Sequence, residues 1–421
     1  MAREFDLIVF GATGFTGRHV AAYLSARAGE AGLTWAAAAR DGERAARALE
    51  QVGAKPDALI TADIGDPASL NTMAARGRYV LDLVGPYALY GRPVIEACIA
   101  HETGYLDLTG EIPFVREILL DLDADARAAG VKVIQVSGFE ALPADLLVRM
   151  AAETASERHG EPLVTADLAV STKMPPGIPR LSDGISGGTF QSVVALTGRE
   201  DAASVTDSAA LIDDPALARR VRSLSPIALA PRPGEDGAVV GPMAPAPFIN
   251  PAVIHRSEEL AARAEGRDAH PFRYREGIAF AGSPATLPLR WAVAGTLSAT
   301  QYAMRAMAQA GPSVRQPVAR VLGAIGPAAG SGPDEERMQH WHWEMVVRAQ
   351  TTAGNVVHTR LDADGHPGYL STARMVGEAG VQLASAGATT DAVGCLTPAA
   401  ALGTACTPAF ASAGVRFSVD P

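Results

Sequence analysis

Short apolar runs alternate with amphipathic stretches through the first third of the chain. Each apolar run is long enough for one buried strand, and together they predict strands at residues 5–10, 34–39, 57–61, 78–84, 105–107 and 131–136. Between them, apolar residues recur at helical spacing, most clearly at 91–100 and 113–129. Strands that alternate with helices form a parallel sheet covered on both faces, so this region predicts a doubly wound α/β fold.

The pattern changes after a connecting helix predicted at residues 142–157. A strand at 163–172 and a helix from Ser186 to Leu196 come next. The stretch 226–251 is rich in proline and glycine and predicts a long surface loop or lid. Apolar and polar residues then alternate at 341–348 and continue at 355–361, as in an antiparallel hairpin with one buried face. Two further helices are predicted at 371–384 and 398–413.

Three glycines mark the junction between the first predicted strand and the first helix. Gly11, Gly14 and Gly17 have the spacing G-x-x-G-x-x-G, with a strand before them and a helix after them. In such a turn, glycine permits a tight bend, close approach to a phosphate and close packing of helix on strand. The helix also directs free N–H groups at the ligand. We therefore predict a pyrophosphate site formed by Gly11, Thr13, Gly14, Phe15, Thr16 and Gly17. Arg18, which opens the helix, is a candidate to add charge to a 2′-phosphate of the nucleotide, with a solvated helix residue as the alternative.

The end of the second predicted strand bears on which dinucleotide is bound. An acidic residue there holds the ribose 2′-hydroxyl of NAD, whereas an arginine accommodates the 2′-phosphate of NADP. Arg40 stands at this point and favours NADP, although Asp41 follows it and keeps NAD open. Asp63, after the third strand, is a candidate for the adenine edge or for the turn itself. Val84, Gly85, Pro86 and Tyr87 end the fourth strand, where a nicotinamide ring is expected.

Composition narrows the range of partners. The chain has 421 residues and a net charge of −10, and it lacks the clustered cations that nucleic acid requires. Cys98, Cys395 and Cys406 are scattered, which argues against disulfides and zinc and fits a reducing cytosol. The histidine spacing suggests no metal. No apolar run reaches the ~20 residues of a spanning helix, and no secretory signal opens the chain. Contact with a membrane surface and a homodimer both remain open.

Several segments together resemble the saccharopine dehydrogenase-like family and, within it, the trans-acting enoyl reductase branch of actinobacteria. They are FGATGFTGR, VGPYALYGRPVIEAC, GYLDLTGE, SGFEALPAD, SGGT, PFINPAVIHRS, FRYRE and LTPAAALG. The resemblance spans nearly the whole chain. It implies a Rossmann domain at 1–145, a second α+β domain with a mainly antiparallel sheet at 146–385, and a C-terminal helical segment at 386–421 that returns to the first domain. It also implies NADPH-dependent reduction of a carbon–carbon double bond on a small or carrier-bound acyl substrate.

Reduction of an enoyl group needs a hydride at the β-carbon, a donor to the enolate oxygen and an acid for the α-carbon. Tyr87 and Tyr90 are the candidate acids by position, with packing against the nicotinamide as the alternative. Asp107 and Glu111 are candidates as acids or as turn and capping residues. Candidates for the substrate wall are Ser137, Phe139, Lys173, Ser186, Gly187, Asn250 and His255. The sequence departs from the branch here: Pro251 follows Asn250, and Val253-Ile254-His255 replaces a more basic stretch.

Two other functions stay open at this point. A saccharopine-type amino-acid or imine dehydrogenase needs cationic anchors for carboxylates, which Arg180, Arg273 and Arg275 are placed to supply. A non-catalytic NADP-sensing regulator would keep the glycine turn without a catalytic pocket. Short-chain dehydrogenase chemistry is disfavoured, because no tyrosine is followed by a lysine four residues later.

Overall fold

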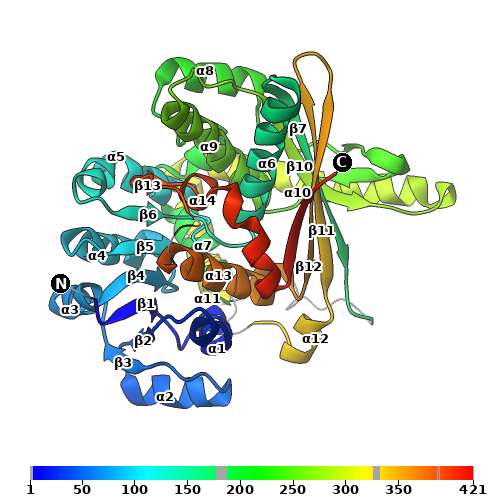
Figure 1. Ribbon diagram of the computed structural model, residues 1–421. Helices are drawn as coiled ribbons and strands as arrows, with labels where there is room; N and C mark the ends of the chain where they lie inside the picture. Colours follow the sequence, from blue (N-terminus) through cyan, green and yellow to red (C-terminus); the bar gives the residue numbers. More distant parts are fainter. Residues whose placement is uncertain (1–2, 177–186, 326–331, 386, 388, 421) are drawn as a thin grey trace.

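Two seven-stranded sheets organise the part of the chain that the computed structural model describes, residues 3–176, 187–325, 332–385, 387 and 389–420 (Figure 1). The first sheet is entirely parallel and the second is mixed and mainly antiparallel, which confirms the predicted fold class. Helices lie around the first sheet and between the two sheets.

The first sheet has the order β13-β6-β5-β4-β1-β2-β3. Its strands are β1 (Phe5–Phe10), β2 (Trp35–Ala39), β3 (Ala58–Thr61), β4 (Gly77–Asp82), β5 (Gly104–Asp107), β6 (Lys132–Ile134) and β13 (Gly394–Leu396). Chain order runs outward from β1 to β3 and then resumes at β4 on the other side of β1. Ligands of open parallel sheets bind at the carboxyl ends of the strands where the order reverses, here between β1 and β4.

Five helices connect the strands of this sheet, and a sixth arrives from much later in the chain. They are α1 (Phe15–Glu30), α2 (Gly42–Gln51), α3 (Pro67–Arg76), α4 (Tyr87–Ala100), α5 (Ile112–Ala128) and α13 (Thr372–Ala384). Helices α1 and α13 pack side by side (Figure 1). Between them, the buried Glu378 accepts hydrogen bonds from the Tyr23 hydroxyl at 2.5 Å and from the Arg27 guanidinium at 3.1 Å. This contact ties the second half of the chain to the first helix.

The second sheet has the order β14-β12-β11-β7-β10-β9-β8, and only the β7–β10 pair is parallel. Its strands are β7 (Leu163–Lys173), β8 (Arg232–Pro233), β9 (Val239–Gly241), β10 (Arg273–Phe280), β11 (His342–Thr351), β12 (Val356–Asp364) and β14 (Val415–Val419). The inner face buries Trp343, Met345 and Val347. Helix α6 (Leu142–His159) lies on that face, where the Leu147 carbonyl accepts a hydrogen bond from the Thr359 hydroxyl at 2.9 Å.

Besides α13, seven further helices follow α6 in the described part of the chain. They are α7 (Gly187–Gly198), α8 (Pro215–Leu224), α9 (Asn250–Glu265), α10 (Leu287–Gln309), α11 (Pro312–Ile325), α12 (Glu335–Gln339) and α14 (Pro398–Leu402). Among them, α7 packs on α4 and α14 contacts β6, so both lie beside the first sheet. Short 3₁₀ segments lie at Ala202–Thr206, Glu235–Gly237, Ala246–Phe248, Pro284–Thr286 and Thr404–Ala413, and a π turn lies at Pro367–Ser371.

Two predicted elements differ from the structure. The stretch 226–251 is not one long loop, because β8 and β9 within it pair with each other and β9 pairs with β10. These strands have two and three residues, too few to show alternation in the sequence. The predicted helix 398–413 is broken at Gly403, whose φ is +70°, into α14 and a 3₁₀ segment. The last residues join both sheets, β13 beside β6 and β14 beside β12; the domain boundaries themselves stay predictions.

Replacing Glu378 with alanine tests the junction between α1 and α13. It leaves the Tyr23 hydroxyl and the Arg27 guanidinium without their shared acceptor, so the free energy of unfolding is expected to fall by about 3 kcal/mol. Urea denaturation measures this change. The control, Glu4→Ala, removes the exposed partner of Arg76 and is expected to change little. Equal, small effects of both substitutions would contradict the assigned role of Glu378.

Candidate functional site at the carboxyl edge of the parallel sheet

The turn after β1 is too crowded for side chains at two of its glycines. Gly11 has φ +88°, and a Cβ there would lie 2.8 Å from Cγ2 of Val84. A Cβ on Gly17 would lie 2.2 Å from the Gly11 carbonyl oxygen. Both distances are shorter than real Cβ contacts, so only glycine lets α1 begin directly against β1 and β4. The first helix therefore starts at the edge of the sheet, beside the point where the strand order reverses.

The amino terminus of α1 offers a site for an anion. Gly14 is its N-cap residue and supplies no side-chain acceptor, and no acidic residue lies in the first turn. The first N–H groups of a helix have no partner within the helix, and the helix dipole makes this end positive. Thr13 and Thr16 are half-buried beside the turn. These features fit a pyrophosphate, which would lie over residues 13–17.

The end of β2 presents an arginine rather than a carboxylate. The Arg40 side chain is 78% exposed, and its Nε lies 4.0 Å from Oδ2 of Asp63, at the end of the neighbouring strand. The Asp41 carboxylate instead caps α2, accepting a hydrogen bond from the Arg44 backbone N–H at 2.9 Å. Asp41, the acidic residue that left NAD binding possible in the sequence, is thus engaged as the N-cap of α2. The arrangement fits the 2′-phosphate of NADP, held by the planar guanidinium of Arg40.

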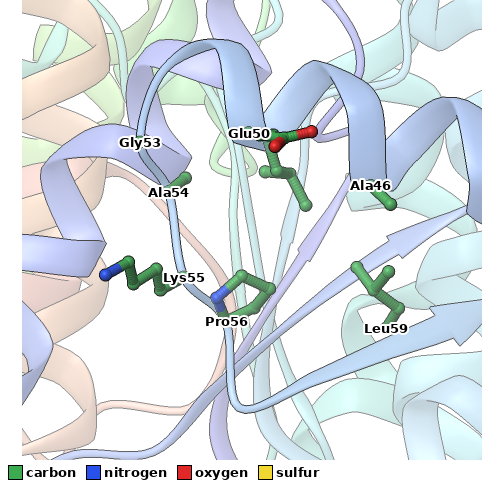
Figure 2. Close-up of a pocket in the computed structure, with 8 residues that line it drawn as sticks. Ala46, Glu50, Gly53, Ala54, Lys55, Pro56 and Leu59 are labelled. Carbon is green, nitrogen blue, oxygen red and sulfur yellow. The ribbon is translucent and has the colours of Figure 1, made fainter.

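A separate hollow of about 350 Å³ lies between α2 and the segment that precedes β3 (Figure 2). Ala46, Leu49 and Leu59 form its apolar wall, and Glu50 and Lys55 lie at its margin. Gly53 to Pro56 enter the amino end of β3, whereas the glycine turn and Arg40 follow the carboxyl ends of β1 and β2. The hollow is therefore distinct from the predicted nucleotide site.

Two predicted cofactor residues on α1 also contact the second half of the chain. The Phe15 ring packs edge-on against Tyr369, with centroids 5.4 Å apart, and the Arg18 guanidinium lies over the Phe15 ring at 4.9 Å. Arg18 also pairs with Glu335 at 3.0 Å. These contacts bring Glu335 and Tyr369 beside the first turn of α1. A direct contact of Phe15 or Arg18 with the nucleotide stays a prediction.

The segment after β4 places Tyr87 and Tyr90 on α4, which begins at Tyr87 rather than at residue 91. The Tyr87 hydroxyl donates to the Asp82 carbonyl oxygen at 3.1 Å, and burial raises its pKa well above the usual value. Its backbone N–H and that of Ala88 donate to the buried Glu111 carboxylate at 3.0 and 2.8 Å. Glu111 thus caps α4, while Tyr90 is 39% exposed. Tyr87 reaches the edge of the sheet with its hydroxyl directed inward.

Asp107 is the centre of a buried network between β5 and β6. Its carboxylate accepts hydrogen bonds from the Tyr105 hydroxyl and from the backbone N–H groups of Thr109 and Val136, at 3.0, 3.0 and 3.1 Å. Burial raises its pKa to about 7 despite these bonds. The same Tyr105 hydroxyl contacts Asp82 at 3.2 Å. Asp107 therefore fixes the loops at the ends of two strands, and its side chain is fully engaged.

The segment after β6 has an unusual backbone conformation. Val136 and Ala141 have φ values of +62° and +68°, which costs a residue with a Cβ about 1–2 kcal/mol each. The Ala141 N–H donates to Oδ1 of Asn250 at 2.9 Å, and Ser137 and Ala141 form an isolated antiparallel bridge. Contacts from the second half of the chain thus hold this segment at the sheet edge. Backbone strain of this kind is often found at functional sites.

Asn250 connects this segment to a buried carboxyl group that the sequence analysis did not select. Its Nδ2 donates to Oε2 of Glu276 at 2.7 Å, and the Tyr274 hydroxyl donates to the same oxygen at 3.1 Å. Oε1 of Glu276 is buried and has no hydrogen-bond partner among the described residues. Burial raises the Glu276 pKa to about 7. The signal available in the sequence was the pair Tyr274 and Glu276, which alternation places on one face of a strand.

The other predicted substrate-wall residues are distributed more widely. Ser137 is buried, and its hydroxyl has no partner among the described residues, while Phe139 packs edge-on against Trp343 at 5.0 Å. Lys173 is exposed at the end of β7. His255 is buried against Phe272, and burial lowers its pKa to about 3, so it is neutral at pH 7. Gly187 begins α7, and Ser186 lies outside the described residues.

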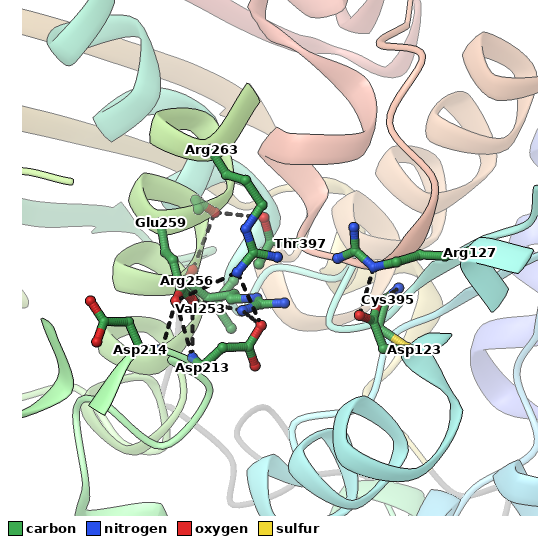
Figure 3. Close-up of polar contacts among 11 residues, drawn as sticks. Asp123, Arg127, Asp213, Asp214, Val253, Arg256, Glu259, Arg263, Cys395 and Thr397 are labelled. Atoms are coloured by element: carbon green, nitrogen blue, oxygen red, sulfur yellow. Dashed lines mark hydrogen bonds and ion pairs between the residues drawn. The ribbon is translucent and has the colours of Figure 1, made fainter. Parts of the chain in front are cut away.

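Helix α9, which carries Asn250 in its first turn, is anchored by the buried side chains of Arg256 and Glu259 (Figure 3). Arg256 is 2% exposed, and its Nη1 lies 2.7 Å from Oδ2 of Asp213 and 2.6 Å from Oε2 of Glu259. Glu259 also accepts from the backbone N–H groups of Asp213 and Asp214. The residue after Arg256 makes a further contact, because the Ser257 and Thr397 hydroxyls lie 2.6 Å apart. These contacts fix the position of α9 and, through it, that of Asn250.

Within the described ranges, no group of three or more histidine, cysteine, aspartate or glutamate side chains is arranged to hold a metal ion. None of the helices described in the structure combines the length and the apolar character that crossing a bilayer requires.

The fold and the sheet edge define a class of protein, an oxidoreductase that binds a nicotinamide dinucleotide at a Rossmann sheet. Residues 7–134 match the family model of the saccharopine dehydrogenase NADP binding domain. The chain is also 31% identical over 429 residues to a putative trans-acting enoyl reductase of Mycobacterium tuberculosis, which covers 99% of this chain and 97% of that protein. The chain belongs to the saccharopine dehydrogenase-like family, and its cofactor is NADP(H).

Further comparisons agree with this membership. A trans-acting enoyl reductase of Mycobacterium ulcerans is 30% identical over 435 residues, covering 99% of this chain and 98% of that protein. The apo saccharopine dehydrogenase (L-Glu forming) of Saccharomyces cerevisiae superposes with a TM-score of 0.53 at 13% identity, with 99% of both chains covered. At 13% identity, the similarity to the yeast enzyme supports the fold alone.

Replacing Arg40 with serine tests which nucleotide the end of β2 selects. Loss of charge-assisted hydrogen bonds to the 2′-phosphate is expected to raise the Kd for NADPH about 10- to 100-fold and to leave the Kd for NADH nearly unchanged. Fluorescence titration with both reduced nucleotides measures this. Arg47→Ser, on the exposed face of α2, is the control. Equal weakening of both nucleotides by Arg40→Ser would contradict the assignment.

Proposed function

We propose that this protein is an NADPH-dependent reductase of a carbon–carbon double bond conjugated to a thioester or a comparable carbonyl. The observation that carries the proposal is the similarity, over 98–99% of the chain, to proteins named trans-acting enoyl reductases. The uncapped amino terminus of α1 and the exposed Arg40 support the part of the proposal that concerns NADPH binding. The buried Glu276 supports the part that concerns proton transfer to the substrate.

The protein must supply binding, orientation and a proton, whereas NADPH supplies the hydride. Asn250 and Tyr274 both donate to Oε2 of Glu276, which favours the proton of the neutral acid on Oε1. Oε1 is the buried oxygen with no partner in the described part of the chain. With a pKa of about 7, Glu276 holds this proton in a large fraction of molecules at neutral pH. We assign Glu276 as the acid that protonates the α-carbon.

The position of this acid relative to the sheet favours the same role. Ile249 packs against Gly110, because a Cβ on Gly110 would lie 2.7 Å from Cδ1 of Ile249. Asn250 bonds to Ala141 beyond β6. The network thus adjoins the ends of β5 and β6, on the side of β4 toward which a nicotinamide ring is expected to extend. The strained segment 136–141 contributes the Ser137 hydroxyl as a candidate donor to the enolate oxygen.

The earlier candidate acids take other parts in this proposal. Tyr87 and the first turn of α4, which Glu111 caps, are assigned to packing against the nicotinamide ring. Asp107 positions the loops after β5 and β6. Tyr90, exposed on the first turn of α4, is the alternative acid. The substrate is expected to be an acyl thioester, free or carrier-bound. The buried thiols of Cys98, Cys395 and Cys406 fit a cytosolic location. A homodimer stays a prediction.

The amino-acid or imine dehydrogenase alternative receives less support. Its proposed cationic anchors include Arg275, whose guanidinium is engaged by the Asp167 carboxylate at 2.5 and 2.8 Å. Arg273 is exposed, and Arg180 lies outside the described residues. A regulator without catalysis would not require a buried carboxyl group held by two donors. Oxidation of NADPH in the presence of enoyl thioesters, imines or keto acids separates the three functions.

Glu276→Gln is expected to lower kcat for enoyl thioester reduction about 100-fold or more, with an unchanged Kd for NADPH, because the acid is lost while the fold is kept. The wild-type rate falls as pH rises through about 7, since only the protonated acid acts, and this limb disappears in the variant. Steady-state kinetics across pH measure both effects.

Glu344→Gln, on the opposite face of the second sheet, is the matched control and is expected to behave like the wild type. If Tyr90→Phe reproduces the loss and Glu276→Gln does not, Tyr90 is the acid. If NADPH binds but imines rather than enoyl thioesters are reduced, the proposed reaction is wrong and the dehydrogenase alternative holds.

A further inference from the structure

Helix α10 buries a polar stripe and leaves its apolar residues in solvent. Of its 23 residues, only Arg290, Ala294, Ser298 and Gln301 are buried, a single narrow line along the helix. Surface helices of globular proteins ordinarily show the reverse arrangement, with the apolar stripe toward the core. Figure 1 shows part of this helix projecting from the body of the molecule. An inverted helix of this kind indicates that something outside the chain covers it.

The exposed apolar side chains concentrate on α10 and the following helix. Of the fifteen exposed large apolar side chains among the described residues, eight lie on α10 and α11. The six on α10 are Leu287, Leu289, Trp291, Val293, Tyr302 and Met304, and the two on α11 are Val314 and Val321. Leu289 is 66% exposed and Trp291 is 37% exposed. Clustering of this kind marks a site of interaction rather than ordinary surface composition.

The charge of this region is opposite to that of the rest of the molecule. Residues 277–333 contain no aspartate, glutamate or lysine, and they contain four arginines, Arg290, Arg305, Arg315 and Arg320. With a net charge of −10 for the whole chain, the region carries +4 and the remainder −14. A basic, apolar segment on a strongly acidic protein is attracted to an anionic surface, and the acidic remainder is repelled from it.

The four arginines keep their charge unneutralised within the described structure. Arg290 donates only to backbone carbonyls, those of Gly237, Phe280 and Ser283. Arg315 likewise donates to the carbonyls of Thr197, Arg199, Glu200 and Ala310. Among the ion pairs of the described residues, none involves these two or Arg305 or Arg320, whereas most other arginines are paired. Arg290 and Arg315 are buried, whereas Arg305 is half-buried and Arg320 is exposed, so the last two are the arginines placed to meet an anionic partner.

We propose that α10 and α11 form a peripheral docking surface for an anionic lipid membrane. Apolar side chains and the amphipathic rings of Trp291 and Tyr302 enter the boundary between headgroups and acyl chains, and Arg305 and Arg320 attract the anionic headgroups. A second copy of the chain is a poorer occupant, because a two-fold interface would place this basic surface against itself. The surface works independently of the reaction proposed for the sheet edge.

The test uses the full-length protein and vesicles of phosphatidylcholine alone or with about one third phosphatidylglycerol. Sedimentation is expected to show binding to the anionic vesicles, weakened by salt and much lower on the neutral ones. Trp291 supplies a direct signal, because Trp35, Trp341 and Trp343 are buried. Its fluorescence is expected to shift to the blue and to be quenched by brominated lipid. Replacing Arg305 and Arg320 with glutamine is expected to weaken binding about fivefold per arginine.

Leu289→Glu is expected to abolish binding, and Leu120→Glu on α5 is the matched control, since both leucines are 66% exposed and only the first lies on the proposed surface. The proposal is overturned if neither vesicle binds the wild-type protein, if Leu289→Glu binds as the wild type does, or if Trp291 emission is unchanged on binding. It is also overturned if light scattering shows a dimer that Leu289→Glu dissociates and that binds no vesicle. Both substituted positions are at the surface, so folding is expected to be retained, which circular dichroism checks.

Discussion

The close approach of α1 to the turn after β1 is the constraint on which the rest of this structure depends. A side chain at residue 17 would overlap the Gly11 carbonyl, and one at residue 11 would overlap Val84. Because glycine removes these overlaps, the first helix begins at the sheet edge with its N–H groups uncapped. That position sets where phosphate can bind, and the next strand end then sets which nucleotide is preferred, through Arg40.

The second half of the chain completes the site rather than only adjoining it. Helix α13 packs on α1 through Glu378, and Asn250 holds the strained backbone at Ala141. Asn250 also bonds to Glu276, so a single amide links the end of β6 to the buried acid. The ion pairs of Arg256 keep α9 in place beneath this amide. Cofactor binding and proton transfer are thus assigned to different halves of the molecule, joined by polar contacts that include the buried Glu378 and Asn250.

Much of the first sheet was predictable because its information is local. Each apolar run is one strand, and the glycine spacing marks the turn after β1. The sequence left Asp41 as a residue that could hold the ribose of NAD. Its carboxylate instead caps α2, a role that depends on where the helix begins. Glu276 was missed because its burial depends on how α9 packs against the second sheet, although both hydrogen-bond partners, Tyr274 and Asn250, are near it in the chain. His255 was selected as a polar wall residue, yet burial against Phe272 keeps it neutral. Strands β8, β9 and β13 have two or three residues and exist only through their neighbours.

The most direct test of the central claim is to follow the hydrogen atoms during one turnover. NADPH with deuterium at both C4 positions of the nicotinamide is mixed with an enoyl thioester and the protein in ordinary water, and the saturated product is analysed by mass spectrometry and NMR. One deuterium is expected at the β-carbon and a solvent-derived hydrogen at the α-carbon. Consumption of NADPH without deuterium in the product, or no saturated thioester at all despite bound NADPH, would contradict the proposed reduction.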